Sequence, residues 1–177
     1  MQSLTYYVAT SIDGAIARPD DSFEFFVNEG DHVTDYLAAL RTFDSVVMGR
    51  RTYEVGTKLG VTNPYPWLAT YVISTTVDPN IDPNVTVVAE DAAGFVRALK
   101  QRDGRGIYLC GGGQLATQLL AQDLIDEIIL KLSPVIAGGG IPVFGAMDHA
   151  TRLDLVECKP YASGVVVLRY RVRRQAR

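Results

Sequence analysis

Apolar, β-branched runs recur along the chain and are separated by amphipathic stretches in its first two thirds. We expect strands at residues 4–10, 45–48, 71–74, 85–88, 107–110, 125–135 and 164–172, with the run at 125–135 as the longest. Strands that read as nearly continuous apolar runs are typical of a sheet buried on both faces. The pattern therefore predicts an α/β chain with a largely buried sheet.

Helical spacing marks the segments between these runs. In residues 31–41 one stripe collects the apolar side chains Val33, Tyr36, Leu37 and Leu40. Residues 91–101 repeat the pattern, with Asp91 as the expected N-cap. A third helix is expected after the glycines at 111–113. No clear helix precedes the final strand, which favours a mixed sheet with an antiparallel C-terminal edge.

Composition narrows the class of protein. The 177 residues are 47% hydrophobic and carry a formal charge of -3, with no repeat or linker, so we expect one domain over 1–177 and no general affinity for nucleic acid or membranes. No signal-peptide pattern or membrane-length apolar run is present, so we expect a cytoplasmic protein. The C-terminus is locally basic, through Arg169, Arg171, Arg173, Arg174 and Arg177. Their alternation with apolar residues predicts a strand with one solvated face.

Cysteine and histidine are scarce. Cys110 and Cys158 lie in strand-like runs without further metal-ligating neighbours, so we expect buried free thiols and no metal site. His32 and His149 have no local catalytic partner, and we expect surface or capping roles for both.

The first of two notable strand-to-helix junctions is glycine followed by two arginines. Gly49 ends an apolar run, and Arg50, Arg51 and Thr52 open the next segment. Glycine lets a ligand approach the backbone, a helix start offers unpaired N–H groups, and arginines add forked donors. An anion is the natural occupant, although a glycine turn with two solvated arginines is the alternative.

The second junction is a glycine triplet, Gly111, Gly112 and Gly113, followed by Gln114 and Leu115. Successive glycines ahead of an amphipathic helix expose backbone N–H groups of the kind that cradle a pyrophosphate. A glycine run can also relieve crowding between a helix and a sheet. Two such junctions in one small domain favour a dinucleotide, because its phosphates are separated.

Four motifs follow one another over nearly the whole chain. They are SIDGAIA at 11–17, GRRTYE at 49–54, the glycine triplet, and LIDE at 124–127 running on to SPVIAGGGIPVF at 133–144. In this order they resemble the reductase domain of the bifunctional riboflavin-biosynthesis deaminase-reductase, the RibD C-terminal domain family, and its stand-alone relatives. The resemblance implies a three-layer α/β/α, dihydrofolate-reductase-like domain, with a mostly parallel eight-stranded sheet and an antiparallel C-terminal strand.

The same resemblance implies NADPH as cofactor and gives roles to matching positions. The nicotinamide carboxamide would meet the backbone of Ala9 and Ile16. The adenosine-side phosphates would meet Gly49, Arg50, Arg51 and Thr52, and the ribose with its 2′-phosphate would meet Ser74, Thr75 and Thr76. The pyrophosphate would meet Gly111, Gly112, Gly113, Gln114 and Leu115, with a strained or cis peptide between the first two glycines.

The implied activity is hydride transfer from NADPH to a carbonyl or imine of a small heterocyclic or sugar-derived substrate, and the implied assembly is a homodimer. Reduction of 5-amino-6-(5-phosphoribosylamino)uracil is the family's reaction, and dihydrofolate or pterin reduction is the alternative. An NADP-binding sensor without turnover is the rival of another class. No H-x-E with a following P-C-x-x-C occurs, which excludes the deaminase activity. Cys110 stands where the riboflavin enzyme often has glutamate.

Candidate substrate contacts are few, and the catalytic residue stays unassigned. Tyr36 lies at the edge of the helical stripe, and Trp67 could wall a ring-shaped substrate or anchor its loop. Asp31 and Asp35 point away from that stripe, so we expect both to be solvated with ordinary pKa values. A proton would then come from water or from the substrate, with Tyr36 as a less favoured donor.

Overall fold

The computed structural model describes residues 1–174. The main sheet contains β1 (Leu4–Thr10), β3 (Ser45–Gly49), β4 (Ala69–Ile73), β5 (Val85–Val88), β6 (Ile107–Cys110), β7 (Glu127–Leu132), β9 (Leu153–Pro160) and β10 (Val166–Val172). The short strands β2 (Ala15–Ala17) and β8 (Ile141–Pro142) form a separate two-stranded ribbon. The helices are α1 (Asp31–Leu40), α2 (Arg50–Lys58), α3 (Ala92–Gln101) and α4 (Gly113–Ala121).

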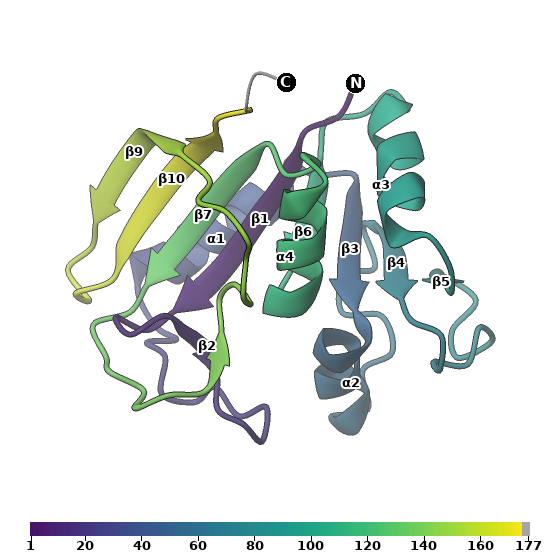
Figure 1. Ribbon diagram of the computed structural model, residues 1–177. Coiled ribbons are helices and arrows are strands. Elements are labelled where there is room, and N and C mark those ends of the chain that lie inside the picture. The colour runs from purple at the N-terminus through teal and green to yellow at the C-terminus, as the bar shows by residue number, and fades with distance from the viewer. Residues whose placement is uncertain (175–177) are drawn as a thin grey trace.

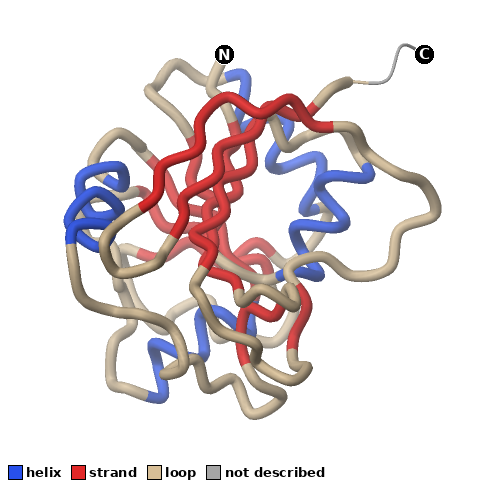
Figure 2. Tube along the Cα trace, turned by 90° about the vertical axis from the view of Figure 1, so that its left-hand side faces the viewer, coloured by secondary structure: helices blue, strands red, loops and turns tan. Residues whose placement is uncertain are grey.

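The sheet has the order β5-β4-β3-β6-β1-β7-β10-β9. The first six strands in this order are parallel, and β10 and β9 join antiparallel. Helices lie on both sides of the sheet, as Figures 1 and 2 show. This confirms the three-layer, mostly parallel eight-stranded fold. The antiparallel edge holds two strands.

Alternation along the strands builds two cores. Successive side chains point to opposite faces, so Tyr6 packs in the core under α3 and α4, while Tyr7 packs in the core under α1 and α2. Asp91 caps α3, because its Oδ1 accepts a hydrogen bond from the Gly94 N–H at 2.8 Å, which confirms the expected N-cap. In Figure 1 the parallel strands point their carboxyl ends toward the lower edge, where α2 and β2 lie.

Strand lengths differ from the expectation. β7 has 6 residues, and the longest strand is β9 with 8, a segment that the apolar pattern did not mark. Six of the eight β9 residues are exposed, because it is the edge strand and is covered on one side only. With so few buried positions, β9 lacks the regular apolar pattern by which a strand is recognised in the sequence.

Three expectations about single residues were wrong. Cys158 is exposed on edge strand β9, so it is not a buried thiol. His32 is fully buried, because its two ring nitrogens bind the Val27 carbonyl and the Ser163 hydroxyl, each at 3.1 Å. Leu37 is 52% exposed, so it leaves the expected stripe, while Leu40 of that stripe is fully buried. His149 is exposed, as expected.

The basic C-terminal side chains take part in ion pairs with neighbouring strands. Arg169 pairs with Glu127 at 2.7 Å, and Arg174 pairs with Asp126 at 3.0 Å. Arg177 lies outside the described residues. Within residues 1–174 no helix is long and apolar enough to span a membrane, and no group of three potential metal ligands occurs.

Candidate functional site

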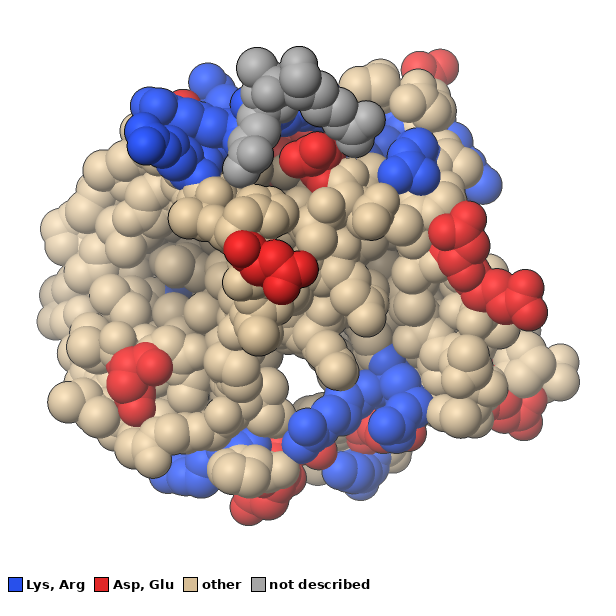
Figure 3. Space-filling model, in the orientation of Figure 1, with Lys and Arg blue, Asp and Glu red and all other residues tan. Residues whose placement is uncertain are grey.

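A cavity of about 540 Å³ opens at the carboxyl edge of the sheet, where β1, β3 and β6 end. This volume lies in the usual range of small-molecule sites. The predicted residues that line it are Ile16, Gly49, Arg50, Arg51, Thr52, Gly111, Gly112, Gly113, Gln114 and Leu115. Figure 3 shows basic side chains beside an opening at the lower edge of the molecule. The fold thus brings both phosphate-suited junctions to one cavity.

Thr52 of α2 lies directly against the glycine triplet. A Cβ on Gly111 would come within 3.0 Å of the Thr52 Cγ2, and one on Gly112 within 3.4 Å of its Oγ1. Both glycines have left-handed φ angles, 57° and 75°, which L side chains rarely adopt. No cis peptide occurs in residues 1–174, so the expected cis bond between Gly111 and Gly112 is not found, and glycine adopts these two φ angles at little cost. The two junctions therefore lie against each other, with the Thr52 side chain in contact with the triplet.

Helices α2 and α4 both begin at this surface with glycine caps. Gly49 caps α2 and Gly112 caps α4, and no side chain of the described residues supplies a cap hydrogen bond to either. The first-turn N–H groups of a helix lack partners inside the helix, and the helix dipole places partial positive charge there. Both helix starts are therefore suited to an anion.

Two arginines flank the helix starts, and each is held by a carboxylate. Arg50 binds both oxygens of Glu54 at 2.9 and 2.8 Å, and Arg51 pairs with Asp21 at 2.8 Å. The two arginine side chains are 49% and 53% exposed. Exposed ion pairs contribute only about 0–1 kcal/mol, so a phosphate can replace these partners at little cost.

Several predicted residues lie outside the cavity lining. Ser74 is buried, and its Oγ accepts hydrogen bonds from the Thr76 and Val77 N–H groups at 3.1 and 3.0 Å. The neighbouring Thr75 and Thr76 are exposed. Trp67 is absent from the lining, and its ring packs under the Arg41 guanidinium at 3.9 Å. The further positions absent from the lining are Ala9 and Tyr36.

Asp13, from the first motif, ties two loops together. Its carboxylate accepts the N–H groups of Ala137, Gly138 and Gly139 at 2.9, 2.9 and 3.2 Å. The Ser11 hydroxyl, at 2.6 Å, and then these backbone donors hold the pKa of Asp13 far below its usual range. The motif therefore positions the loop that leads to Ile16 at the cavity.

A cluster of polar groups borders the cavity, and we name it the tyrosine cluster: the buried Tyr108 and the half-buried Tyr36, Tyr65 and Cys110. The Tyr36 and Tyr108 hydroxyls lie 3.0 Å apart, and the Tyr65 hydroxyl lies 3.5 Å from the Cys110 Sγ. Tyr65 and Cys110 line the cavity. Of these four residues, the sequence indicated only Tyr36 as a substrate contact. The i, i+2 spacing of Tyr108 and Cys110 before the triplet was the available signal, since it places both on one sheet face.

The two aspartates of α1 lie away from the cavity. Asp31 is exposed. Asp35 pairs with the Lys159 ammonium at 2.5 Å and accepts the Tyr161 hydroxyl at 2.7 Å. These two partners, Lys159 first, lower the pKa of Asp35, so the expectation of an ordinary pKa was wrong for this residue. Its direction away from the cavity agrees with the expectation.

Comparison with known proteins points to one family. The model of the RibD C-terminal domain matches residues 2–167. YwjB, an uncharacterized protein of Bacillus subtilis (strain 168), is 36% identical over 162 residues, which cover 90% of this chain and 92% of that protein.

Solved structures show the same fold. A candidate riboflavin-biosynthesis protein from Shewanella sp. PV-4 superposes with a TM-score of 0.83 at 24% identity, covering 98% of this chain and 100% of that one. The diaminohydroxyphosphoribosylaminopyrimidine deaminase/5-amino-6-(5-phosphoribosylamino)uracil reductase of Thermotoga maritima superposes with a TM-score of 0.72 at 15% identity. That match covers 97% of this chain and 57% of the bifunctional enzyme.

Proposed function

We propose an NADPH-dependent reductase activity, from the premise that the chain belongs to the RibD C-terminal domain family. The observation that carries the proposal is the meeting of two uncapped helix starts and a glycine triplet at one cavity. Backbone donors from two separate junctions fit the separated phosphates of a dinucleotide better than those of a mononucleotide.

The residues at the cavity fit this cofactor. Gly111 and Gly112 line the cavity and carry no side chain, so a pyrophosphate can contact their backbone there. Arg50 and Arg51 offer exposed guanidinium groups for a further phosphate. The proposal also includes Ala9, Ser74, Thr75 and Thr76 as cofactor contacts. Because they lie outside the cavity lining, the protein would have to move toward the cofactor for them to reach it.

The chain's own contribution is binding, orientation and exclusion of water. Apolar side chains of Val8, Met48 and Ile141 line the cavity. When bound, NADPH supplies a hydride to the carbon of a carbonyl or imine, and a proton must reach its oxygen or nitrogen. A substrate related to the ribosylaminopyrimidine of riboflavin synthesis is the proposed class, and pterin reduction is the alternative.

Calorimetric titration tests the cofactor. Charge-assisted hydrogen bonds contribute roughly 1.5–3 kcal/mol each, so NADPH should bind at least about tenfold more tightly than NADH. Arg51→Ala should weaken NADPH more than NADH, and Arg105→Ala, which removes an exposed arginine paired with Asp44 outside the cavity lining, should change neither. Equal affinities for the two cofactors in the wild-type protein would contradict the preference.

Turnover separates an enzyme from a sensor. Steady NADPH oxidation with a member of a panel of pterins, pyrimidines and quinones supports a reductase. Stoichiometric binding without turnover on every member of the panel supports the sensor instead.

We also propose a cytoplasmic homodimer, with the exposed Leu155 and Val156 of edge strand β9 as the contact. Sedimentation of the L155K variant tests the dimer.

A further inference from the structure

The tyrosine cluster borders the cavity proposed for the cofactor. Cys110 is the last residue of β6 and directly precedes the glycine triplet, and Tyr65 lies in the loop between α2 and β4. Both line the cavity, while Tyr36 and Tyr108 lie behind them. Tyr65 and Cys110 are therefore the members of the cluster that a bound ligand can contact.

The hydrogen bonds of the cluster stay within it. Two tyrosines elsewhere in the fold donate to groups that only accept: Tyr6 binds the Val143 carbonyl at 3.0 Å, and Tyr161 binds the Asp35 carboxylate at 2.7 Å. Within residues 1–174 the cluster's hydroxyls and thiol contact one another and no carbonyl or carboxylate. The Tyr65 hydroxyl has the Cys110 sulfur, a weak acceptor, as its partner at 3.5 Å, so a carbonyl oxygen on a ligand would be a stronger acceptor for its hydrogen.

The cluster is neutral near pH 7. Burial raises the pKa of Tyr36 to about 12, and it raises the pKa values of Tyr65, Tyr108 and the Cys110 thiol as well. All four groups thus keep their hydrogens. They can donate hydrogen bonds to a ligand, but they offer no negative charge to a cation.

The charged residues around the cluster also disfavour a cationic ligand. The carboxylate in the cavity lining is Asp21, and it is already paired with Arg51 at 2.8 Å and with Lys58 at 3.4 Å. The Lys131 ammonium lies 5.2 Å from the centre of the Tyr36 ring and has no carboxylate partner in the described part of the chain. A positively charged substrate would find no counter-ion here, whereas an acceptor oxygen finds several donors.

We propose that the substrate presents a neutral ring carbonyl and that Tyr65 contacts its oxygen as hydrogen-bond and proton donor. This rests on the proposed reductase function and narrows its carbonyl or imine to a carbonyl. The hydride forms a C–H bond at the carbonyl carbon while the C=O π electrons move to the oxygen. The Tyr65 proton then forms the O–H bond, and water returns a proton to the tyrosinate. NADPH is oxidised and the carbonyl is reduced to an alcohol.

The experiment pairs Tyr65→Phe with Tyr71→Phe. Tyr71 is a half-buried tyrosine of β4 that packs on Phe95, at 5.0 Å, outside the cavity, so it controls for loss of a hydroxyl. Turnover is measured on neutral ring carbonyls (quinones, cyclic ketones and cyclic imides) and on cyclic iminium or amidinium cations. Binding of glutarimide is measured by calorimetry with and without NADP⁺, and NADPH affinity is measured for every variant.

The wild type should reduce neutral carbonyls faster than cations. Tyr65→Phe should lower kcat on carbonyls by about 100-fold, within the usual range of a general acid. It should weaken glutarimide about tenfold, while NADPH affinity and the Tyr71→Phe control stay at wild-type values. The proposal is overturned by wild-type kcat and glutarimide affinity in Tyr65→Phe, by preferred reduction of cations, or by no glutarimide binding at all. Absence of NADPH binding, with glutarimide binding that still depends on Tyr65, contradicts the proposed reductase function and the proton transfer and leaves the carbonyl contact standing.

Discussion

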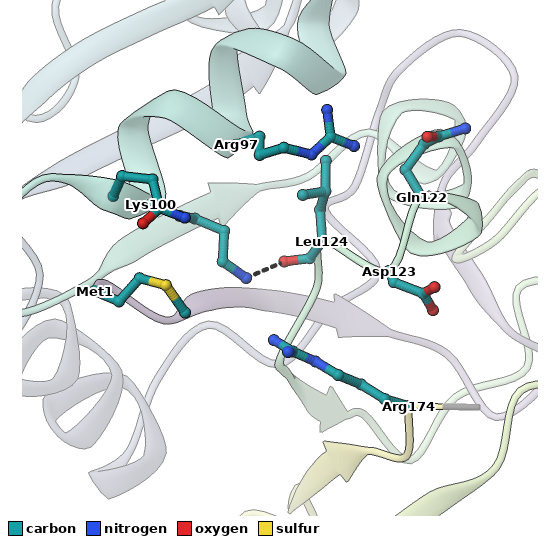
Figure 4. A pocket seen from close by; sticks show the side chains of 8 residues that line it. Met1, Arg97, Lys100, Gln122, Asp123, Leu124 and Arg174 are labelled. Atoms are coloured by element: carbon teal, nitrogen blue, oxygen red, sulfur yellow. Dashed lines mark hydrogen bonds between the residues drawn. The ribbon is translucent and has the colours of Figure 1, made fainter. Parts of the chain in front are cut away.

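The two ends of helix α4 lie at two cavities, which differ in whether the polar groups around them already have partners within the protein. At its C-terminal end a cavity of about 360 Å³ lies at the amino edge of the sheet, bordered by basic side chains of α3 and the C-terminus. There Lys100 donates to the Leu124 carbonyl at 2.7 Å, as Figure 4 shows, and pairs with Asp126 at 2.5 Å. Arg174 pairs with the same aspartate. The positive charges of Lys100 and Arg174 lie near helix C-termini, which carry partial negative charge, and both already have partners within the protein.

At its N-terminal end α4 lacks a side-chain cap. Gly112 supplies no side chain to its first turn, and the same holds for Gly49 at α2, within the described residues. Asp91 shows that the chain can cap a helix that begins at this edge, because it closes the start of α3, which does not border the cavity. A helix end completed by its own side chains stabilises the fold, whereas an end left with free backbone donors is suited to a ligand.

The largest expected effect comes from placing a side chain in the open end. Gly112→Val should lower NADPH affinity by at least about 100-fold, because its Cβ occupies the backbone surface beside Thr52. Gly60→Val is the matched control: Gly60 has φ 76°, nearly the 75° of Gly112, and nothing lies within 4 Å of its added Cβ. Both variants should lose similar stability in thermal unfolding, and only the first should lose binding. Retained binding in a folded Gly112→Val protein would show that the glycines serve packing.

The next effect concerns the completed end. Lys100→Met should lower the free energy of unfolding by about 1–3 kcal/mol, because the Leu124 carbonyl loses its ammonium donor. For a domain of this size that corresponds to a fall in Tm of roughly 2–12 °C. NADPH affinity should stay unchanged by calorimetry. A changed affinity with unchanged Tm would reverse the roles assigned to the two cavities.

The smallest effect comes from completing the open end artificially. Gly49 has extended backbone angles, φ −81° and ψ 163°, and an added Cβ makes only ordinary contacts with Leu115, so Gly49→Asp can cap α2. We expect a gain of a few tenths of a kcal/mol in stability and a loss of about tenfold in NADPH affinity, since the carboxylate repels phosphate. Gly49→Ser should cap with a smaller loss. Unchanged affinity in Gly49→Asp would mean that no phosphate approaches α2.

The sequence alone determined the features that depend on local periodicity and backbone chemistry. Apolar runs marked the central strands because these are buried on both faces, and Asp91 was recognisable because capping is a local interaction. The two glycine junctions were recognisable for the same reason, since a glycine before a helix has the same meaning in any fold. The order of the motifs also identified the family.

Tertiary structure alone decided which distant residues meet. Strand β9 was missed because it is the edge strand. The burial of His32 on α1 was missed because its partners, Val27 and Ser163, lie outside the helix and helical periodicity does not reveal them. The tyrosine cluster joins α1, β6 and the loop before β4, so its members are up to 74 positions apart along the chain (from Tyr36 to Cys110). Hydrogen bonds between such segments depend on sheet order and helix rotation, which long-range packing sets and local sequence does not.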